Sequence, residues 1–196
     1  MEVNTMGNQG CSEPLIQDTA TKLFQTAALL LGDESEAVQL VEETMSAAEV
    51  DPCADGTQAQ LVLQNQLVEA AVRTLSVRDP GSFAVAASIT GNPLCIDDDD
   101  LSASGVSPAQ LSQLLEGGGR GQLRDWLEHL PASQRVIFVE RALLKQNNAL
   151  AAEVLRAGGG ENAAGWTAEK VSEAFRQALC SLATSLVHSG TAVPAV

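Results

Sequence analysis

The sequence predicts an all-α protein, and three observations lead to that prediction. Apolar residues recur at intervals of three and four along several stretches, which places them on one side of a helix. Ala and Leu, which are strong helix formers, are abundant, whereas aromatic residues make up only 3% of the 196 residues. No stretch alternates strictly between apolar and polar residues as a half-buried strand does. We therefore expect helices and no β-sheet.

The N-terminal part is expected to form a helical bundle. A first helix over residues 21–31 is followed by Gly32, a typical residue just beyond a helix end. Asp33 is expected to cap a second helix, because its spacing to Glu36 is that of a capping box. Two helices joined by so short a turn pack antiparallel. A third helix is expected over residues 57–78.

Residues 80–121 are expected to form an acidic linker, because Gly, Ser and Pro recur there and four Asp residues follow one another at 97–100. The Asp run is interpreted as solvated, since calcium-binding loops alternate ligands with spacer residues. One short helix over 107–116, with Pro108 in its first turn, is expected to interrupt the linker. Further helices are expected over 123–130 and 132–145, from Asn147 or Asn148 to 156, and over 167–188.

These elements give two small helical domains joined by a flexible linker. The expected boundaries are a disordered N-terminus at 1–14, a first helical domain at 15–79, the linker at 80–121, a second helical domain at 122–188 and a tail at 189–196.

The charge is distributed unevenly along the chain. The sequence has 11 Lys and Arg residues against 25 Asp and Glu residues, for a formal net charge of -14. Residues 1–122 contain 4 basic and 18 acidic residues, whereas residues 123–196 contain 7 of each. Proteins that bind nucleic acids normally present a basic patch that neutralises phosphate. Neither part of this sequence has an obvious one.

The cysteines and histidines argue against a metal site and against catalysis. Cys11, Cys53, Cys95 and Cys180 lie far apart, and none has the spacing to another Cys or His that zinc sites show. We expect reduced structural thiols, no metal and no cofactor. Two histidines and no tyrosine are a thin acid and base repertoire, so we expect no enzymatic activity. No apolar run approaches the length of about 18 to 20 residues of a membrane span, so we expect a cytoplasmic protein without membrane contact.

Two separate stretches carry recognisable motifs. Residues 23–48, LFQTAALLLGDESEAVQLVEETMSAA, contain Leu-Leu-Gly-Asp and Leu-Val-x-Glu-Thr, and residues 123–143, LRDWLEHLPASQRVIFVERAL, contain Leu-Pro-x-x-Gln-Arg-x-x-Phe. They resemble the beginnings of region 2 and region 4 of the small two-domain sigma factors of bacterial RNA polymerase, the extracytoplasmic-function group. The order of the motifs and the linker between them also agree with that family. The resemblance implies a region 2-like helical bundle and a region 4-like helix-turn-helix.

The resemblance implies a protein partner. In that family the helix around the Leu-Val-x-Glu-Thr motif docks on the clamp helices of the largest catalytic subunit of RNA polymerase. Carried over to this sequence, the docking residues are Gln39, Glu42 and Glu43. The alternative is that these residues are simply the solvated side of an amphipathic helix.

The residues that open the promoter in the family have no counterpart here. Unstacked bases are held by aromatic side chains, and their phosphates are held by Lys and Arg. Residues 57–78 contain no aromatic residue and only two cations, Arg73 and Arg78. Strand opening is therefore not expected.

The predicted recognition helix, residues 167–188, has a balanced charge. Lys170 and Arg176 are its candidate DNA-binding residues, and Glu169 and Glu173 oppose them. The preceding AGGGENAAGW sequence replaces the usual turn of about 3 to 4 residues. Promoter binding is accordingly expected to be weak or absent.

Two functions remain open from the sequence. The first is a sigma-factor-like transcription protein that associates with RNA polymerase and contributes weakly to promoter recognition. The second is a degenerate relative that acts through protein contacts alone, without DNA binding. A regulatory protein is a further candidate partner in both cases.

Overall fold

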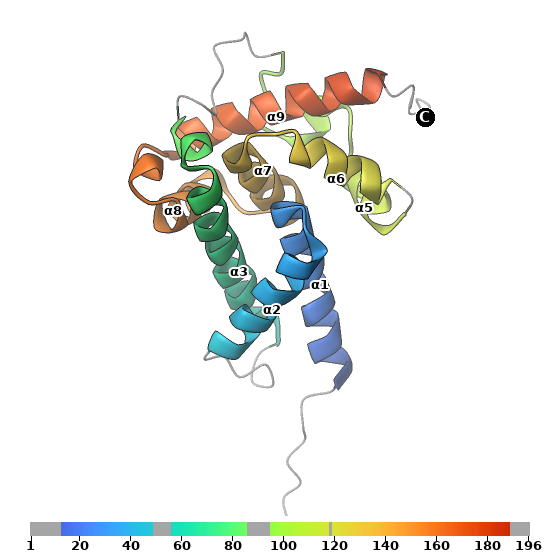
Figure 1. Ribbon diagram of the computed structural model, residues 1–196. Coiled ribbons are helices and arrows are strands. Elements are labelled where there is room, and N and C mark those ends of the chain that lie inside the picture. Colours follow the sequence, from blue (N-terminus) through green and yellow to red (C-terminus); the bar gives the residue numbers. More distant parts are fainter. Residues whose placement is uncertain (1–12, 49–55, 86–94, 118, 189–196) are drawn as a thin grey trace, which may run out of the picture.

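The chain is described by a computed structural model over residues 13–48, 56–85, 95–117 and 119–188. Over these ranges every regular element is a helix and no β-strand occurs, which confirms the all-α prediction (Figure 1). Helix α9 crosses one end of the molecule, while α1, α2 and α3 extend away from it toward the opposite end. The predicted disordered N-terminus and tail lie almost wholly outside the described residues.

The elements follow one another along the chain with short connections. They are α1 (Glu13–Leu31), α2 (Glu34–Ala47), α3 (Gly56–Arg78), η1 (Pro80–Phe83), η2 (Leu101–Ser104), α5 (Pro108–Glu116), α6 (Arg120–Glu128), α7 (Ala132–Phe138), η3 (Val139–Leu143), α8 (Asn148–Gly158), η4 (Glu161–Ala163) and α9 (Ala168–His188). Of the short elements, η1, η2 and η4 are 3₁₀ turns, and η3 is a π-helical turn that continues α7.

Side-chain caps fix several helix starts where the sequence predicts them. The Asp33 side chain accepts a hydrogen bond from the Glu36 amide at 2.9 Å and so begins α2. Ser107 and Gln110 form a reciprocal capping box at the start of α5. Asn147 accepts from the Leu150 amide at 3.0 Å and begins α8.

Two helices differ from the expected ranges. Helix α1 begins at Glu13, eight residues before the predicted start. The helix expected over 132–145 instead changes to a π-helical turn at Val139. Because a π-turn accommodates an extra residue, it changes which side chains face inward, and here Glu140 is turned into the interior.

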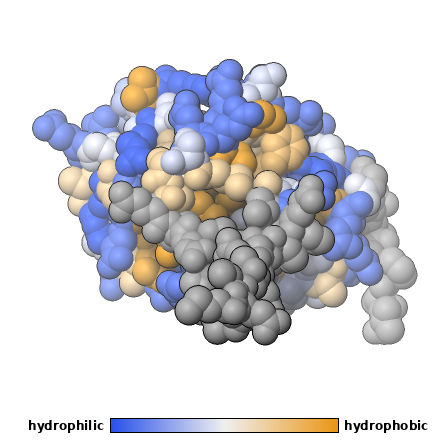
Figure 2. All heavy atoms as spheres, turned by 90° about the horizontal axis from the view of Figure 1, so that it is seen from below, coloured by the Kyte–Doolittle hydropathy of each residue, from blue (hydrophilic) through white to orange (hydrophobic). Residues whose placement is uncertain are grey.

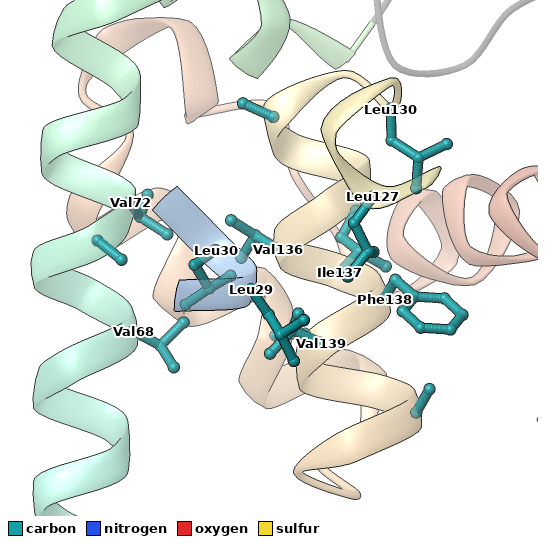
Figure 3. Packing of buried hydrophobic residues seen from close by; sticks show 14 of the residues in the cluster. Leu29, Leu30, Val68, Val72, Leu127, Leu130, Val136, Ile137, Phe138 and Val139 are labelled. Carbon is teal, nitrogen blue, oxygen red and sulfur yellow. The ribbon is translucent and has the colours of Figure 1, made fainter. Parts of the chain in front are cut away.

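One hydrophobic core joins both halves of the chain. Helix α3 packs against α1 and α2 and also against α7 and α8. Figure 3 shows the junction, where side chains of α1, α3, α6 and α7 lie together. The labelled residues there are Leu29, Leu30, Val68, Val72, Leu127, Leu130, Val136, Ile137, Phe138 and Val139. The arrangement of two separate domains is therefore not confirmed.

The described parts of the predicted linker also contribute to this core. Phe83 is completely buried, and Ile96, Leu101, Val106 and Leu111 are buried in the same cluster. Burying these apolar side chains removes them from water, which outweighs the flexibility that the surrounding Gly, Ser and Pro residues favour. This packing differs from the free linker that composition predicts. Residues 86–94 and 118 lie outside the described part.

Two cysteines correct the prediction of reduced thiols. Cys95 and Cys180, 85 residues apart in sequence, form a disulfide with a Cα–Cα distance of 5.7 Å. The prediction was wrong for this pair because sequence spacing does not show that the chain before η2 lies beside the middle of α9. Cys11 and Cys53 are outside the described residues. Among the helices that the structure places, none is both long and apolar enough to cross a membrane.

Candidate functional site

The three predicted docking residues share the exposed side of α2. Gln39, Glu42 and Glu43 are all exposed. The opposite side of the helix is held in the core by the buried residues Ala37, Leu40, Val41 and Thr44. Helix α2 thus presents a polar, acidic face to solvent on a rigid support.

A groove lies next to this face, between α2 and α3. Its volume is about 430 Å³, and it is lined by Leu40, Glu43, Thr44, Ala47, Gln66, Glu69, Ala70 and Arg73. Arg73 donates to Glu69 at 2.5 Å, so the rim contributed by α3 carries both signs of charge. Sequence reasoning did not include the α3 residues in the site. Their spacing at 66, 69, 70 and 73 is nevertheless that of a single helix face, and it was the available signal.

The surface toward the free ends of α1, α2 and α3 is mixed in character. Figure 2 shows hydrophobic residues gathered beside the segments drawn in grey, within a largely hydrophilic surround. Val38 on α2 and Leu61 on α3 are among the large apolar side chains that remain exposed, at 44% and 43%. Such exposed apolar residues within a polar surround are typical of surfaces that contact other proteins.

The two candidate DNA-binding residues lie on α9 but already have protein partners. The Lys170 ammonium lies 3.6 Å from the Glu173 carboxylate, one turn further along α9. The half-buried Arg176 donates to the backbone carbonyl of Asp97 at 3.3 Å. The structure therefore does not bring Lys170 and Arg176 together as a free basic surface.

The acidic run is packed against cations rather than left in solvent. Arg141 donates to the Asp99 carbonyl at 3.1 Å, and its guanidinium lies 3.7 Å from the Asp99 carboxylate. Asn148 donates to the same carboxylate at 2.8 Å. Hydrogen bonds from Asn148 and Ser172, with the nearby charge of Arg141 and Arg176, lower the pKa of Asp99 despite its partial burial. The expectation of a solvated run is thus wrong for Asp99.

The connection between α8 and α9 is not the tight turn of a helix-turn-helix. It contains η4 and the buried Trp166, whose indole N–H donates to the Phe83 carbonyl at 2.8 Å. Arg156 donates to the Trp166 carbonyl at 2.6 Å and fixes the end of this loop. The helix-turn-helix implied by the resemblance is not supported.

The two motifs that resemble sigma factors contact each other through Arg135. This residue of the Gln-Arg pair donates to the Leu30 carbonyl at the end of α1 at 2.9 Å. The same guanidinium donates to the carbonyls of Leu127 at 3.0 Å and Glu128 at 3.2 Å. A cation at a helix C-terminus is favoured by the exposed carbonyls and by the helix dipole. Arg135 therefore ties α6, α7 and α1 together.

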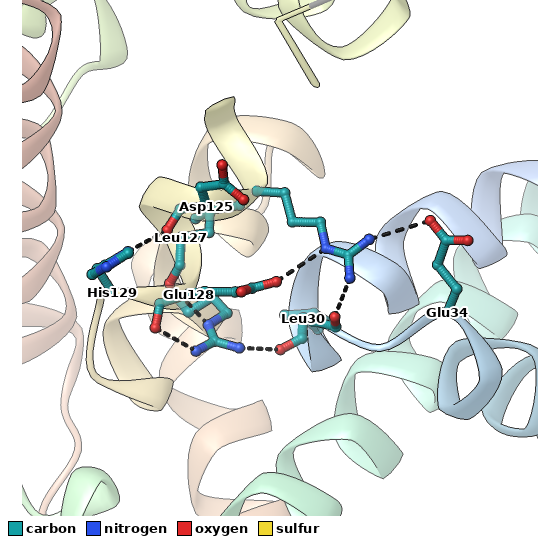
Figure 4. Close-up of polar contacts among 9 residues, drawn as sticks. Leu30, Glu34, Asp125, Leu127, Glu128 and His129 are labelled. Carbon is teal, nitrogen blue, oxygen red and sulfur yellow. Dashed lines mark hydrogen bonds and ion pairs between the residues drawn. The ribbon is translucent and has the colours of Figure 1, made fainter. Parts of the chain in front are cut away.

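Arg124 adds a second link at the same place (Figure 4). It donates to the Gly32 carbonyl, to Glu34 at 3.2 Å and to Glu128 at 3.0 Å. The Leu-Leu-Gly-Asp turn and the start of the second motif are thus held together by charge-assisted hydrogen bonds.

Neither a metal centre nor a relative identifies the site. In the described ranges, no group of three or more His, Cys, Asp or Glu side chains is placed to hold a metal ion. Comparison with family models, with curated proteins and with solved structures finds no match to this chain. The functional argument consequently depends on the α2 face and on the charges around α9.

Proposed function

We propose that this chain is a sigma-factor-like transcription protein that binds bacterial RNA polymerase through α2. The observation that carries the proposal is the exposed face of Gln39, Glu42 and Glu43, which coincides with the Leu-Val-x-Glu-Thr motif and borders the α2–α3 groove. The partner surface implied by the resemblance is formed by the clamp helices of the largest catalytic subunit.

Charge and shape both support docking at this face. Two adjacent carboxylates on a rigid helix attract a basic partner surface and orient it during association. The neighbouring groove can receive a side chain from the partner, and the groove charges of Glu69 and Arg73 offer hydrogen bonds to it.

The alternative is a module that binds protein and no DNA. It is favoured by the partners of Lys170 and Arg176, which are Glu173 and the Asp97 carbonyl. A cation that is already paired gains less from phosphate, because it must first give up its partner. In the form of the protein described here, direct DNA binding is accordingly weak.

Charge reversal on α2 tests the proposal. Glu42→Lys/Glu43→Lys should weaken capture of the catalytic subunit by the full-length protein at least about fivefold, because repulsion replaces attraction at the interface. The measurement is a pull-down of purified core polymerase without DNA, with helicity followed by circular dichroism.

The matched control is Glu116→Lys/Asp125→Lys, which makes the same charge change at exposed positions on α5 and α6. It should capture polymerase as the unmodified protein does. Equal capture by the α2 variant and the control would exclude docking at this face.

A further inference from the structure

A short acidic stretch of the chain is fastened to α9. We call residues 95–100 the acidic segment. Its first residue, Cys95, is joined to Cys180 of α9 by the disulfide, and the next, Ile96, is buried in the core. Directly after the segment, the buried Leu101 begins η2, which also packs against α9. The segment is thus anchored at both ends, covalently at one and by apolar packing at the other.

The acidic segment covers a group of cations. We call Arg141, Lys145 and Arg176 the cationic cluster. Arg141 bonds to both the backbone and the carboxylate of Asp99, and Arg176 bonds to the backbone of the segment. As a result only 18% of the Arg141 side chain is exposed. A pocket of about 270 Å³ remains between the segment and the cluster. It is lined by Asp99, Asp100, Leu101, Pro108, Arg141, Lys145 and Phe175.

The cationic cluster keeps hydrogen-bond donors that the acidic segment does not use. The Nε atoms of Arg141 and Arg176 are buried, and neither has a hydrogen-bond partner within the described part of the chain. A buried donor without a partner costs free energy. A guanidinium that also stacks over a ring, as Arg141 does over Phe175 at 5.2 Å, is well placed to bind phosphate through two N–H groups. The geometry therefore fits an anionic ligand better than it fits the acidic segment.

The disulfide is the strongest of the ties that hold the acidic segment. The ion pair between Arg141 and Asp99 is partly exposed, and such pairs contribute little. The adjacent Asp residues also repel one another. By contrast, a disulfide between residues 85 positions apart removes much conformational freedom from the chain. Cys95 is exposed, so a reductant can reach its sulfur.

We propose that the Cys95–Cys180 disulfide is a redox latch. In the oxidised protein it holds the acidic segment over the cationic cluster, and on reduction it releases the segment so that the cluster binds the phosphates of duplex DNA. The DNA part of this inference rests on the proposed function in transcription, whereas the release of the segment does not.

Opening the latch is a two-electron thiol–disulfide exchange with a dithiol. One thiolate of the dithiol attacks the Cys95 sulfur, the Cys180 thiolate leaves and takes up a proton, and a mixed disulfide forms. The second thiolate of the dithiol then displaces Cys95, which is also protonated. The products are two cysteine thiols and the oxidised, disulfide form of the reductant.

The test uses the full chain in a Cys11→Ser/Cys53→Ser background, so that Cys95 and Cys180 are the only thiols. Hydrogen exchange of residues 96–106 is compared between the oxidised and the dithiothreitol-reduced protein. Reduction should accelerate this exchange at least about tenfold while α3 exchanges unchanged. Equal exchange in the two states would overturn the latch.

DNA binding is measured on the same two samples by fluorescence anisotropy with a random duplex at two salt concentrations. The oxidised protein should bind little. The reduced protein should bind more tightly, with log K falling by up to about 2.7 per decade of salt, since three cations each contribute about 0.9. Faster exchange without any gain in DNA affinity would overturn phosphate binding by the cluster. Polymerase capture, measured separately in both redox states, reports on the α2 face and so distinguishes a failure of the proposed docking from a failure of the latch.

Two substitutions with the same charge change provide the control. Asp99→Asn removes the carboxylate that pairs with Arg141, whereas Asp98→Asn removes an exposed charge from the same segment. In the oxidised protein, Asp99→Asn should increase exchange of residues 96–106 more than Asp98→Asn does. Cys95→Ser should reproduce the reduced state without reductant. If circular dichroism shows that Cys95→Ser is unfolded, the comparison of the two redox states still decides the proposal.

Discussion

Glu140 places an ionisable group in the interior of the molecule. Its side chain is completely buried, and neither carboxylate oxygen has a hydrogen-bond partner within the described ranges. Burial disfavours the charged form and raises the pKa of Glu140 from its ordinary value of 4.5 to about 7. Folding therefore takes up a proton at this residue between those two values.

The stability of the protein should consequently fall as pH rises from about 4.5 to 7. In that range the folded state retains a proton that the unfolded state has lost, and above pH 7 the cost is constant. Glu140→Gln removes the titration. At pH 8 it should raise the free energy of unfolding by about 3 kcal/mol, and near pH 4.5 by little. Denaturant unfolding of both proteins across this range measures the difference.

The exposed Glu153 of α8 gives the control. Glu153→Gln should change stability by a small amount that is nearly independent of pH, because an exposed carboxylate titrates similarly in the folded and unfolded states. A Glu140→Gln difference that does not grow with pH would contradict an ionised, buried carboxylate.

Helices α3 and α8 approach each other closely at a glycine. A Cβ atom at Gly158 would lie 2.8 Å from the Glu69 carbonyl oxygen and 2.8 Å from the Val72 Cβ. The Gly158 carbonyl also accepts a hydrogen bond from Ser76 of α3 at 3.2 Å. The absence of a side chain at this position therefore sets how closely the two halves of the chain pack.

Gly158→Ala should lower the free energy of unfolding by about 1 to 3 kcal/mol, because the added methyl group forces α3 and α8 apart. Gly121→Ala on α6 is the matched control, since no atom lies within 4 Å of the added Cβ. That change should be neutral or stabilise by up to about 1 kcal/mol. Thermal unfolding followed by circular dichroism compares the two, and an equal effect of both would contradict close packing of α3 on α8.

The helices themselves were largely predictable, because their start signals are local. Asp33, Ser107 and Asn147 each bond to an amide three residues further on, and that relation is visible in the sequence. The exposed side of α2 was equally predictable, since helical periodicity separates Glu42 and Glu43 from the buried stripe. The early start of α1 and the π-turn after α7 have no such local signal.

Contacts between distant parts of the chain were not predictable from spacing. Arg135 bonds to Leu30 across 105 positions, and Cys95 bonds to Cys180 across 85. Arg176 was singled out as a DNA contact from its position on the last helix, but its actual partner is Asp97, a residue interpreted as part of a linker. Each of these pairings depends on the tertiary fold, so local periodicity and composition cannot predict it.

At the scale of the whole molecule, the two motif-bearing halves form one body with distinct surfaces. The shared core and the bonds of Arg124 and Arg135 hold the halves together. The acidic face of α2 remains exposed, whereas the cations near α9 are covered by the acidic segment. This division makes docking on a protein partner available in the described state and leaves DNA binding to a state in which the acidic segment has moved.

The central claim is that α2 contacts the clamp of RNA polymerase, and site-specific photo-crosslinking tests it most directly. A photoreactive phenylalanine analogue is placed at Gln39 and, as a control, at the exposed Val77 near the end of α3. Each full-length protein is then irradiated with core polymerase, and the crosslinked peptides are identified by mass spectrometry. We expect the probe at Gln39 to crosslink to the clamp helices of the largest subunit and the probe at Val77 not to do so. A probe at Gln39 that gives no crosslink, or only the crosslinks of the control, would contradict the account.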